Sequence, residues 1–582
     1  MSYSRAAEQI NSFPIPNNAD QSYDYTDEAR AQATPCTWIS QGRVSLLLLL
    51  IALSLSCTPN QPLKERGNER GETTGPVTPV DQNASLQPSS ASSVHNDPNL
   101  TRILDTLLDS QEFGAARWGV AIISLRDGKL IYQRNGDKLF TPASNMKIYT
   151  TAVALDLLGA EYRWRTSVYS EFEPDANGII RGDLVLYGRG APDLQSANTK
   201  DNTNSLEELA LALVKRGVKR IQGNVIGDES YFRGDPIGEG WQWNDLQWYF
   251  GAEASALSIN GNSTDISISS AVEQTKKPTV TTSDEDNYVQ ITNNIATVER
   301  GAKYRIGVHK GPSDNNVVVW GDFPLGARGY GVNLSVHRPA LWASRQFVRE
   351  MKAHGISVDG EANSRDWHTP EKERFNPEGW REVAFVLGKP LGEIVKITNK
   401  HSVNLYSELL LRTLGREREA LLPVHDASGP ERGDEVSGAE VVRLWLSRAG
   451  IKSGNLAIHD GSGLSRLDLV TPEATARLLQ AIRATHSGEI FTRSLPIAST
   501  DGTLQGRLNR LSGRVVAKTG ALTYDNALSG YLTATDGQVY AFSVICNDSV
   551  ARGGAVRMID RLITVLADGL KNRQAAEKPA KS

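Results

Sequence analysis

Cysteine is scarce in this chain. The chain also lacks the Cys and His spacings that are typical of metal sites, which excludes several kinds of metal site. The 582 residues include three cysteines, at positions 36, 57 and 546, and none of them forms a Cys-x-x-Cys motif. The nine histidines are scattered, without a His-x-His or His-Glu-x-x-His pattern. Structural zinc and iron–sulfur sites usually need such spacings. We therefore expect no metal and no other cofactor, and we expect Cys546, which lies in an apolar run, to be a buried, inert thiol.

An excess of positive charge is also missing. The chain has 63 Lys and Arg against 67 Asp and Glu, a net charge of −4, and no basic run stands out. Nucleic-acid-binding proteins usually carry a basic patch, so we expect no nucleic-acid partner. With 39% hydrophobic and 22% charged residues the composition is that of a globular protein. The length allows about two to four domains.

A short apolar segment near the N-terminus has the features of an export signal. Residues 44–56 are uncharged and leucine-rich, but these 13 residues are fewer than a membrane-spanning helix needs, about 18–20. Their length suits the apolar core of a signal peptide, and Arg43 precedes them. Cys57 follows in Ser-Leu-Ser-Cys, which resembles a bacterial lipobox. We expect export to the periplasm or cell envelope. Lipidation at Cys57 as a membrane tether, an ordinary signal peptide and an uncleaved anchor remain alternatives.

Strand and helix patterns occur at both ends of the remaining chain, and a segment with a different residue pattern separates them. Alternating apolar residues predict two strands before residue 135 and three between 515 and 546, which would form one antiparallel sheet flanked by helices. Many short alternating segments punctuated by Gly, Asn and Asp lie between them and indicate β-rich insertions. We divide the chain into an N-terminal extension with export signal (1–57), a Pro- and Ser-rich linker (58–97), the first part of a catalytic domain (98–169), inserted β-rich domain(s) (170–375), the second part (376–573) and a tail (574–582).

Three short motifs carry the chemistry. In chain order they are Ser144-x-x-Lys147, Ser402-x-Asn404 and Lys518-Thr519-Gly520. These are the three active-site elements of penicillin-binding proteins and serine β-lactamases. The apolar pattern at 146–158 predicts a helix directly after the first motif, and a predicted strand carries the third. Each motif alone is weak, since a Ser-x-x-Lys occurs by chance in a chain of this length and a second Ser-x-Asn starts at Ser258.

The types of residue suit attack on an acyl group by a serine. On a helix, Ser144 and Lys147 lie one turn apart on the same face. Lys147 accepts the serine proton only when it is neutral, so its pKa must be lowered by burial and by a second cation, for which Lys518 is the candidate. Ser402 is suited to pass a proton between Lys147 and the leaving group.

The other motif residues are suited to hold a substrate. Asn404 has the donors and acceptor that a substrate amide requires. Thr519, together with Lys518, suits a terminal carboxylate, and Gly520 and Ala521 continue the same predicted substrate-binding strand. The backbone amides of Ser144 and Ala521 are the candidates for an oxyanion hole.

Three other patterns invite different interpretations. Glu173 lies in a segment that imitates the loop of a deacylating glutamate, but it falls before the second motif, and we interpret it as a turn. His459-Asp460-Gly461-Ser462-Gly463 suggests a catalytic triad, yet sequence neighbours rarely face each other productively, and a tight glycine-rich turn is the better interpretation. Trp241, Trp243 and Trp248 are close in sequence and form either a glycan- or peptide-binding surface or, as is commoner, part of a core.

The chain resembles the class C low-molecular-mass penicillin-binding proteins, a family of D-alanyl-D-alanine carboxypeptidases and endopeptidases with large inserted domains. The resemblance runs from about residue 100 to 570. Besides the three motifs it is carried by GDESYF at 227–232, YFGA at 249–252, SAL at 255–257, NKHSVN at 399–404, DGSGLSR at 460–466 and DGTL at 501–504.

The resemblance implies an α+β fold, with a penicillin-binding/β-lactamase-like transpeptidase domain interrupted by the insertions. It implies serine-type cleavage of D-Ala-D-Ala, or of the D-Ala–diamino-acid cross-link, in peptidoglycan stem peptides, and covalent inhibition by β-lactams at Ser144. Two alternatives remain. A serine β-lactamase would share the acylation step, and a non-catalytic, wall-binding lipoprotein would use the site only to sense β-lactams.

Overall fold

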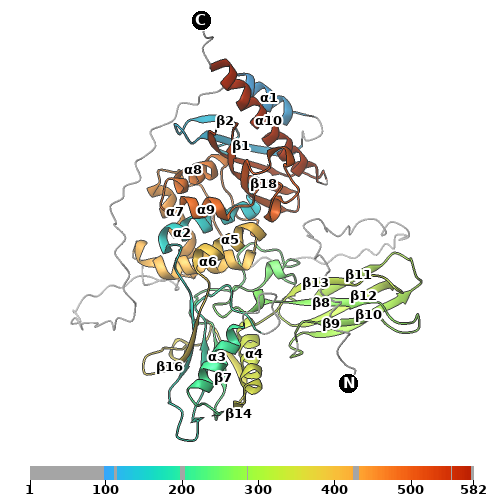
Figure 1. The fold of residues 1–582 in the computed structure, drawn as a ribbon, viewed down its shortest axis with the longest axis vertical. Helices are drawn as coiled ribbons and strands as arrows, with labels where there is room; N and C mark the ends of the chain where they lie inside the picture. The colour runs from blue at the N-terminus through green and yellow to red at the C-terminus, as the bar shows by residue number, and fades with distance from the viewer. Residues whose placement is uncertain are drawn as a thin grey trace, which may run out of the picture. The chain divides into compact units, whose positions relative to one another are not determined.

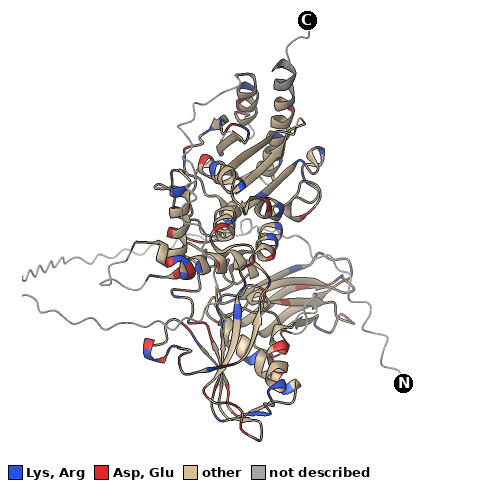
Figure 2. Ribbon diagram, turned by 60° about the vertical axis from the view of Figure 1, so that its left-hand side comes forward, with Lys and Arg blue, Asp and Glu red and all other residues tan. Residues whose placement is uncertain are grey.

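The structure is a computed structural model, and it describes residues 98–110, 115–196, 204–284, 286–423, 432–535, 537–551 and 553–577, the last seven of these without their side chains. The predicted export signal, Cys57 and the linker lie outside the described residues. Basic and acidic residues are interspersed on helices and strands alike (Figure 2). None of the described helices has both the length and the apolar character needed to cross a bilayer.

A five-stranded antiparallel sheet joins the two ends of the described chain, with strand order β17-β18-β19-β1-β2 (Figure 1). Its strands are β1 (Arg117–Ser124), β2 (Leu130–Arg134), β17 (Val515–Leu522), β18 (Asp525–Thr533) and β19 (Val539–Asn547). N-terminal β1 pairs with C-terminal β19, with Trp118 opposite Cys546. The predicted union of two early and three late strands in one sheet is therefore confirmed.

Helices cover both faces of this sheet. Successive residues of a strand point to opposite faces, and β19 shows this, since Val544 packs with helices α1 and α10 while Ile545 packs with α2 and α8. The buried Cys546 lies on the same face as Val544. The helices of this half are α1 (Pro98–Leu108), α2 (Met146–Leu158), α5 (Leu391–His401), α6 (Asn404–Arg418), α7 (Asp434–Arg448), α8 (Pro472–Arg483), α9 (Gly488–Ser494) and α10 (Gly554–Glu577).

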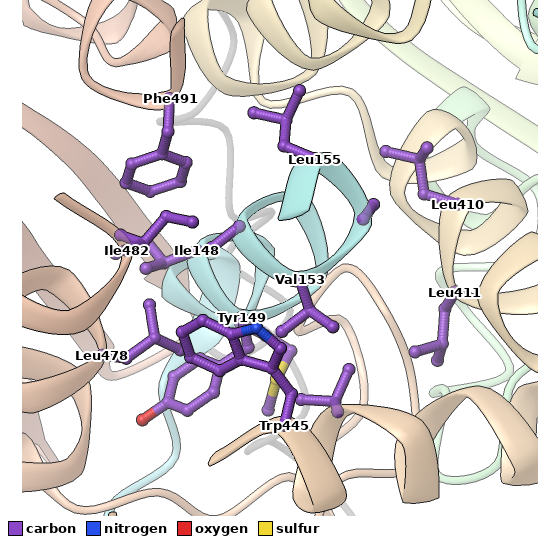
Figure 3. Close-up of a cluster of buried hydrophobic side chains, with 14 of the residues drawn as sticks. Ile148, Tyr149, Val153, Leu155, Leu410, Leu411, Trp445, Leu478, Ile482 and Phe491 are labelled. Atoms are coloured by element: carbon purple, nitrogen blue, oxygen red, sulfur yellow. The ribbon is translucent and has the colours of Figure 1, made fainter. Parts of the chain in front are cut away.

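Helix α2 lies in the middle of the largest apolar cluster. Its first ten residues are all buried, so this stretch has no solvent-exposed face, as expected for a helix surrounded by protein. Figure 3 shows Ile148, Tyr149 and Val153 of α2 among side chains of the surrounding helices. The helix ends at Leu158, and Gly159 follows with φ of 84°, as the sequence predicts. This packing gives the residues at the start of α2 a rigid support.

A long segment between β3 and β16 forms the β-rich part of the chain. Its largest sheet has the order β15-β7-β5-β3-β16, and three three-stranded sheets have the orders β10-β12-β11, β13-β8-β9 and β14-β6-β4. Strands β3 and β16 pair antiparallel, so the chain leaves and re-enters the helical half on neighbouring strands. The elements are β3 (Arg165–Ser170), β4 (Ile179–Ile180), β5 (Leu184–Tyr187), α3 (Ser205–Lys215), β6 (Arg220–Ile221), β7 (Val225–Asp228), β8 (Ser263–Ser269), β9 (Thr279–Thr282), β10 (Gln290–Val298), β11 (Arg305–Lys310), β12 (Asn316–Pro324), β13 (Tyr330–Ser335), α4 (Pro339–Ala353), β14 (Ser357–Val358), β15 (Ala362–Arg365) and β16 (Arg381–Leu387).

Candidate active site

Ser144 lies on a short 3₁₀ turn, η2 (Ala143–Asn145), directly before α2. Ala143 has a φ of 47°, in the left-handed region that costs energy for a residue with a side chain. Asn145 fixes the other side of the turn by donating from Nδ2 to Ser529 Oγ of β18, 2.6 Å away. Ser144 itself is partly exposed between buried neighbours. The turn therefore presents one hydroxyl at the N-terminus of α2, where free amides and the helix dipole favour negative charge.

Two glycines let neighbouring segments approach this turn closely. A Cβ at Gly520 of β17 would lie 2.7 Å from the carbonyl oxygen of Pro142. Gly463 has a φ of 81°, and a Cβ there would lie 1.8 Å from the carbonyl oxygen of Ala143. Strand β17 and the turn that contains Gly463 thus contact the Ser144 turn through backbone, which leaves no room for a side chain at either glycine.

Lys147 is completely buried beneath Ser144. Its Nζ donates to Ser144 Oγ at 3.1 Å, to Asn404 Oδ1 at 2.7 Å and to the carbonyl oxygen of Ser462 at 2.7 Å. Burial lowers the pKa of Lys147 from 10.5 to about 8, although the carboxyl groups of Asp460 and Glu408 counteract it. Lys147 is therefore mostly protonated at neutral pH, but its neutral fraction grows as the pH approaches 8, and it is in hydrogen-bonding contact with the Ser144 hydroxyl.

Lys518 approaches from β17, where it lies opposite Ser529, and it is also buried. Its Nζ donates to Ser402 Oγ at 2.8 Å and to the carbonyl oxygen of Thr519 at 2.9 Å. Burial, and then repulsion by Lys147, hold the pKa of Lys518 well below 10.5. Ser402 ends helix α5 with a φ of 58°, a left-handed conformation that turns its side chain out of the helix and toward Lys518.

The amide of Asn404 is engaged at both of its polar atoms. Its Oδ1 accepts from Lys147, and its Nδ2 donates to the carbonyl oxygen of Phe250 at 2.9 Å. Phe250 belongs to η3 (Tyr249–Gly251), in the segment inserted between the two halves of the helical part. The motif residues predicted from sequence are thus brought together, but Asn404 contacts Lys147 rather than presenting both polar atoms to a substrate.

The predicted substrate-binding residues follow Lys518 along β17. Thr519 is partly exposed, and its Oγ1 donates to Oγ1 of Thr503 at 2.7 Å. Gly520 contacts the Ser144 turn through its backbone, and Ala521 is exposed. Thr503 was not among the residues predicted from the sequence. The DGTL stretch that contains it was a signal of the family resemblance, but not of a contact with Thr519.

The turn at 460–465, after His459, is a second feature whose contact with the site was not predicted from the sequence. Asp460 accepts from the backbone amides of Ser462, Gly463 and Ser465 at 3.1, 2.6 and 2.7 Å. This arrangement is a tight turn, as predicted, and it directs the carbonyl of Ser462 to Lys147. The ring of His459 faces away, with its Nδ1 2.8 Å from Glu239 Oε2, so these residues do not form a triad.

A buried glutamate on α6 supports the same turn. Glu408 Oε1 accepts from the amides of Gly461 and Ser462 at 3.1 and 2.9 Å, and Arg412 donates to Oε2 at 3.1 Å. Because Asn404, Glu408 and Arg412 follow at intervals of four residues, they share one face of α6. Burial raises the pKa of Glu408 to about 7.

The three tryptophans do not form one core cluster, although Trp248 packs against the core of the β-rich segment. The side chain of Trp243 is 73% exposed, and Trp241 and Trp248 are only partly buried. Trp241 donates from Nε1 to Asp460 Oδ2 at 2.9 Å, so it supports the turn that contacts Lys147. Over the described ranges, no group of three or more His, Cys, Asp or Glu residues is arranged to hold a metal ion.

Comparison with known proteins identifies the family. The model of the D-Ala-D-Ala carboxypeptidase 3 (S13) family matches residues 100–566. A D-alanyl-D-alanine carboxypeptidase of Actinomadura sp. (strain R39) is 28% identical over 461 residues, which cover 76% of this chain and 80% of the relative. The D-alanyl-D-alanine carboxypeptidase DacB of Haemophilus influenzae is 26% identical over 440 residues, 73% of this chain and 84% of that protein.

The fold agrees with this assignment. The crystal structure of penicillin binding protein 4 from Haemophilus influenzae matches with a TM-score of 0.68 and 24% identity, and the match covers 80% of this chain and 99% of that one. The predicted family resemblance and the penicillin-binding/β-lactamase-like α+β fold are confirmed. The chain belongs to the D-Ala-D-Ala carboxypeptidase 3 (S13) family and is a peptidase of that family.

Proposed function

We propose that this protein cleaves the terminal D-Ala-D-Ala bond, or the D-Ala–diamino-acid cross-link, of peptidoglycan stem peptides through an acyl-enzyme intermediate at Ser144. The observation that carries the proposal is the 3.1 Å hydrogen bond between Ser144 Oγ and the buried amine of Lys147, whose pKa burial lowers to about 8. A lysine in this state is a suitable general base for a serine.

The reaction proceeds in two halves. Neutral Lys147 takes the proton of Ser144 as its oxygen attacks the carbonyl carbon of the penultimate D-alanine. The tetrahedral intermediate collapses as the C–N bond breaks, and Lys147 returns the proton taken from Ser144, through the hydroxyl of Ser402, to the leaving peptide nitrogen. Lys147 is then neutral again, and Lys518 holds Ser402 at 2.8 Å for this transfer. A water molecule then attacks the carbonyl carbon of the ester while Lys147 accepts its proton. As the bond between that carbon and Ser144 Oγ breaks, Lys147 gives this proton to Ser144 and the acid product is released. The backbone amides of Ser144 and Ala521 donate their N–H groups to the oxyanion and stabilise it in both halves of the reaction.

The substrate lies along β17 in this proposal. Lys518 and Thr519 face the terminal carboxylate, and the backbone of Gly520 and Ala521 continues the same edge. Asn404 has its Oδ1 on Lys147 and its Nδ2 on Phe250. We therefore assign it the additional task of orienting Lys147.

β-Lactams are expected to acylate Ser144 because they present a strained amide and a carboxylate to the same groups. The penicillin binding protein 4 of Haemophilus influenzae has been solved in complex with a β-lactam. A β-lactamase is the less favoured alternative, since the candidate deacylating residue Glu173 pairs with Arg216 at 3.4 Å in the loop after β3.

The envelope location remains part of the proposal. An export signal at 44–56 would deliver the enzyme to the periplasm or cell envelope, where peptidoglycan lies, and a lipid on Cys57 would act as a membrane tether. We also propose the division of the body into catalytic parts at 98–169 and 376–573 around an insertion at 170–375. Metabolic labelling with a fatty acid in wild-type and Cys57→Ser cells tests the lipid tether.

The decisive experiment is intact-mass analysis after incubation with benzylpenicillin. We expect one persistent adduct on the wild type, none on Ser144→Ala, and a normal adduct on Ser512→Ala, a control at an exposed serine. An unmodified wild type with intact drug would contradict the proposed enzyme. An unmodified wild type with the drug destroyed would instead indicate a β-lactamase.

A further inference from the structure

The hydroxyl of Thr503 lies next to Thr519, the threonine that is expected to bind the substrate carboxylate. The 3₁₀ turn η7 (Gly502–Leu504) precedes β17 and places Oγ1 of Thr503 2.7 Å from Oγ1 of Thr519. Both threonines are partly exposed. Thr503 lies outside the three sequence motifs, so its position beside Thr519 results from the fold.

An ion pair between a buried lysine, Lys400, and the partly exposed Asp501 holds the turn of Thr503 in place. Its neighbour Asp501 accepts from Lys400 Nζ with both carboxylate oxygens, at 2.8 and 2.6 Å, and Asp501 Oδ1 also accepts from the amide of Ile497 at 2.8 Å. The side chain of Lys400 is only 8% exposed. Lys400 lies on the last turn of α5, two residues before Ser402. The same helix end therefore fixes both Ser402 and the turn that carries Thr503.

The backbone of the turn is equally constrained. Gly502 has a φ of 57°, and a Cβ there would lie 2.6 Å from the carbonyl oxygen of Lys400. The amide of Ser499 donates to the carbonyl oxygen of Leu504 at 3.0 Å and closes the loop. A turn packed this closely against α5 holds the Thr503 hydroxyl at a defined place, rather than on a freely moving loop.

The direction of the hydrogen bond matters for carboxylate recognition. In this structure the hydroxyl of Thr519 donates to Thr503. A carboxylate accepts hydrogen bonds but cannot donate one, so Thr519 must turn its proton to the carboxylate when the substrate binds. A hydroxyl can also donate, so Thr503 can then donate to the oxygen of Thr519. The hydrogen bond between the two threonines then persists with its direction reversed.

We propose that Thr503 is a positioning residue for recognition of the substrate's terminal carboxylate, acting through a reversible hydroxyl–hydroxyl hydrogen bond to Thr519. The inference rests on the proposed function, because it presumes that Thr519 meets that carboxylate. It adds a fourth element to the three motifs, contributed by the turn at 501–504 and anchored through Asp501 and Lys400.

The test compares the full-length wild type with Thr503→Val, which keeps the shape but loses the hydroxyl, and Thr503→Ser, which keeps the hydroxyl. Each is assayed with diacetyl-L-Lys-D-Ala-D-Ala and with the same peptide as its C-terminal amide, which has no carboxylate. We expect Thr503→Val to raise KM for the free acid about 3- to 10-fold, the range for one lost hydrogen bond, with kcat changed less than about twofold. Thr503→Ser should resemble the wild type, and all three should cleave the amide equally.

Three results would overturn the inference while leaving the proposed function intact. They are an unchanged KM for Thr503→Val, an equal loss for the acid and the amide, and a Thr503→Ser variant as impaired as Thr503→Val. The last two would indicate that Thr503 only supports the loop. If even the wild type failed to cleave the free acid and to form a penicillin adduct, the proposed function and this inference would both be refuted.

Discussion

The side-chain oxygen of Asn404 accepts a hydrogen bond from Lys147 at 2.7 Å, because the nitrogen of the same amide donates to the carbonyl oxygen of Phe250 at 2.9 Å. A carbonyl oxygen can only accept, so Phe250 determines which end of the amide faces Lys147. The inserted segment therefore takes part in arranging the site. By orienting Asn404, this segment gives Lys147 a neutral hydrogen-bond acceptor. A carboxylate at the same place would stabilise the charged form of Lys147 more strongly.

A carboxylate in place of this amide should change the pH dependence. Asn404→Asp puts a negative charge beside Lys147, which favours the ammonium and raises its pKa by about one unit or more. Since the neutral amine is the base, the acid limb of the benzylpenicillin acylation rate should move to higher pH by the same amount. Asn404→Ala is the matched control, because it removes the acceptor without adding charge. An acid limb that stays in place in Asn404→Asp would show that Lys147 is not the group that titrates.

The acylation rate of the wild type should itself depend on pH, with an acid limb whose midpoint lies near pH 8. Burial lowers the pKa of Lys147 from 10.5 to about 8, so the amine is mostly protonated below pH 8 and mostly neutral above it. The acylation rate should therefore fall about tenfold for each pH unit below that value and level off above it. Stopped-flow or mass-spectrometric acylation rates between pH 6 and 9 measure this directly. A rate that is constant from pH 6 to 8 would contradict the assignment of Lys147 as base.

Local spacing explains which parts of the site the sequence predicted. Ser144 and Lys147 share a helix face because they are three residues apart, and the apolar pattern at 146–158 identified that helix. Ser402, Asn404 and Lys518 were found because their motifs are short and keep their chain order. In each case the chemistry resides in a side chain at a fixed distance along the chain from its motif partner.

Contacts made by backbone atoms or by common hydroxyls left no such signal. Ser462 reaches Lys147 through its carbonyl oxygen, which every residue possesses, and Thr503 is one threonine among many. The orientation of Asn404 depends on Phe250, 154 residues away in sequence. Likewise the strands at both ends were predicted from alternation, but the order β17-β18-β19-β1-β2 depends on long-range pairing.

The buried pair Glu408–Arg412 should contribute to stability through compensation of charge. Both side chains are at most 1% exposed, with 3.1 Å between Arg412 NH1 and Glu408 Oε2. Above pH 7, where Glu408 is ionised, Arg412→Met leaves a buried carboxylate without its cation and should lower the free energy of unfolding by about 3–5 kcal/mol. The double variant with Glu408→Gln should recover part of this loss, because the glutamine oxygen still accepts from the amides of Gly461 and Ser462.

Urea unfolding of the two single variants and the double variant measures this coupling. The matched control is Arg493→Met, since Arg493 pairs with Glu489 at the same spacing but both side chains are more than 70% exposed, at 78% and 73%. We expect that variant to change the free energy of unfolding by less than about 1 kcal/mol. Equal losses from Arg412→Met and Arg493→Met would contradict the role assigned to the buried pair.

The contact between Gly463 and the Ser144 turn gives the sharpest steric prediction. An alanine Cβ at 463 would lie 1.8 Å from the carbonyl oxygen of Ala143, and the φ of 81° adds strain of about 1–3 kcal/mol. Gly463→Ala should therefore slow acylation by benzylpenicillin at least about tenfold and lower the unfolding midpoint. Gly454→Ala is the control, because no atom lies within 4 Å of its Cβ position. If the two variants acylated equally fast, the turn that contains Gly463 would not determine the position of Ser144. The backbone contact between Gly463 and Ala143 could then not be part of the catalytic arrangement.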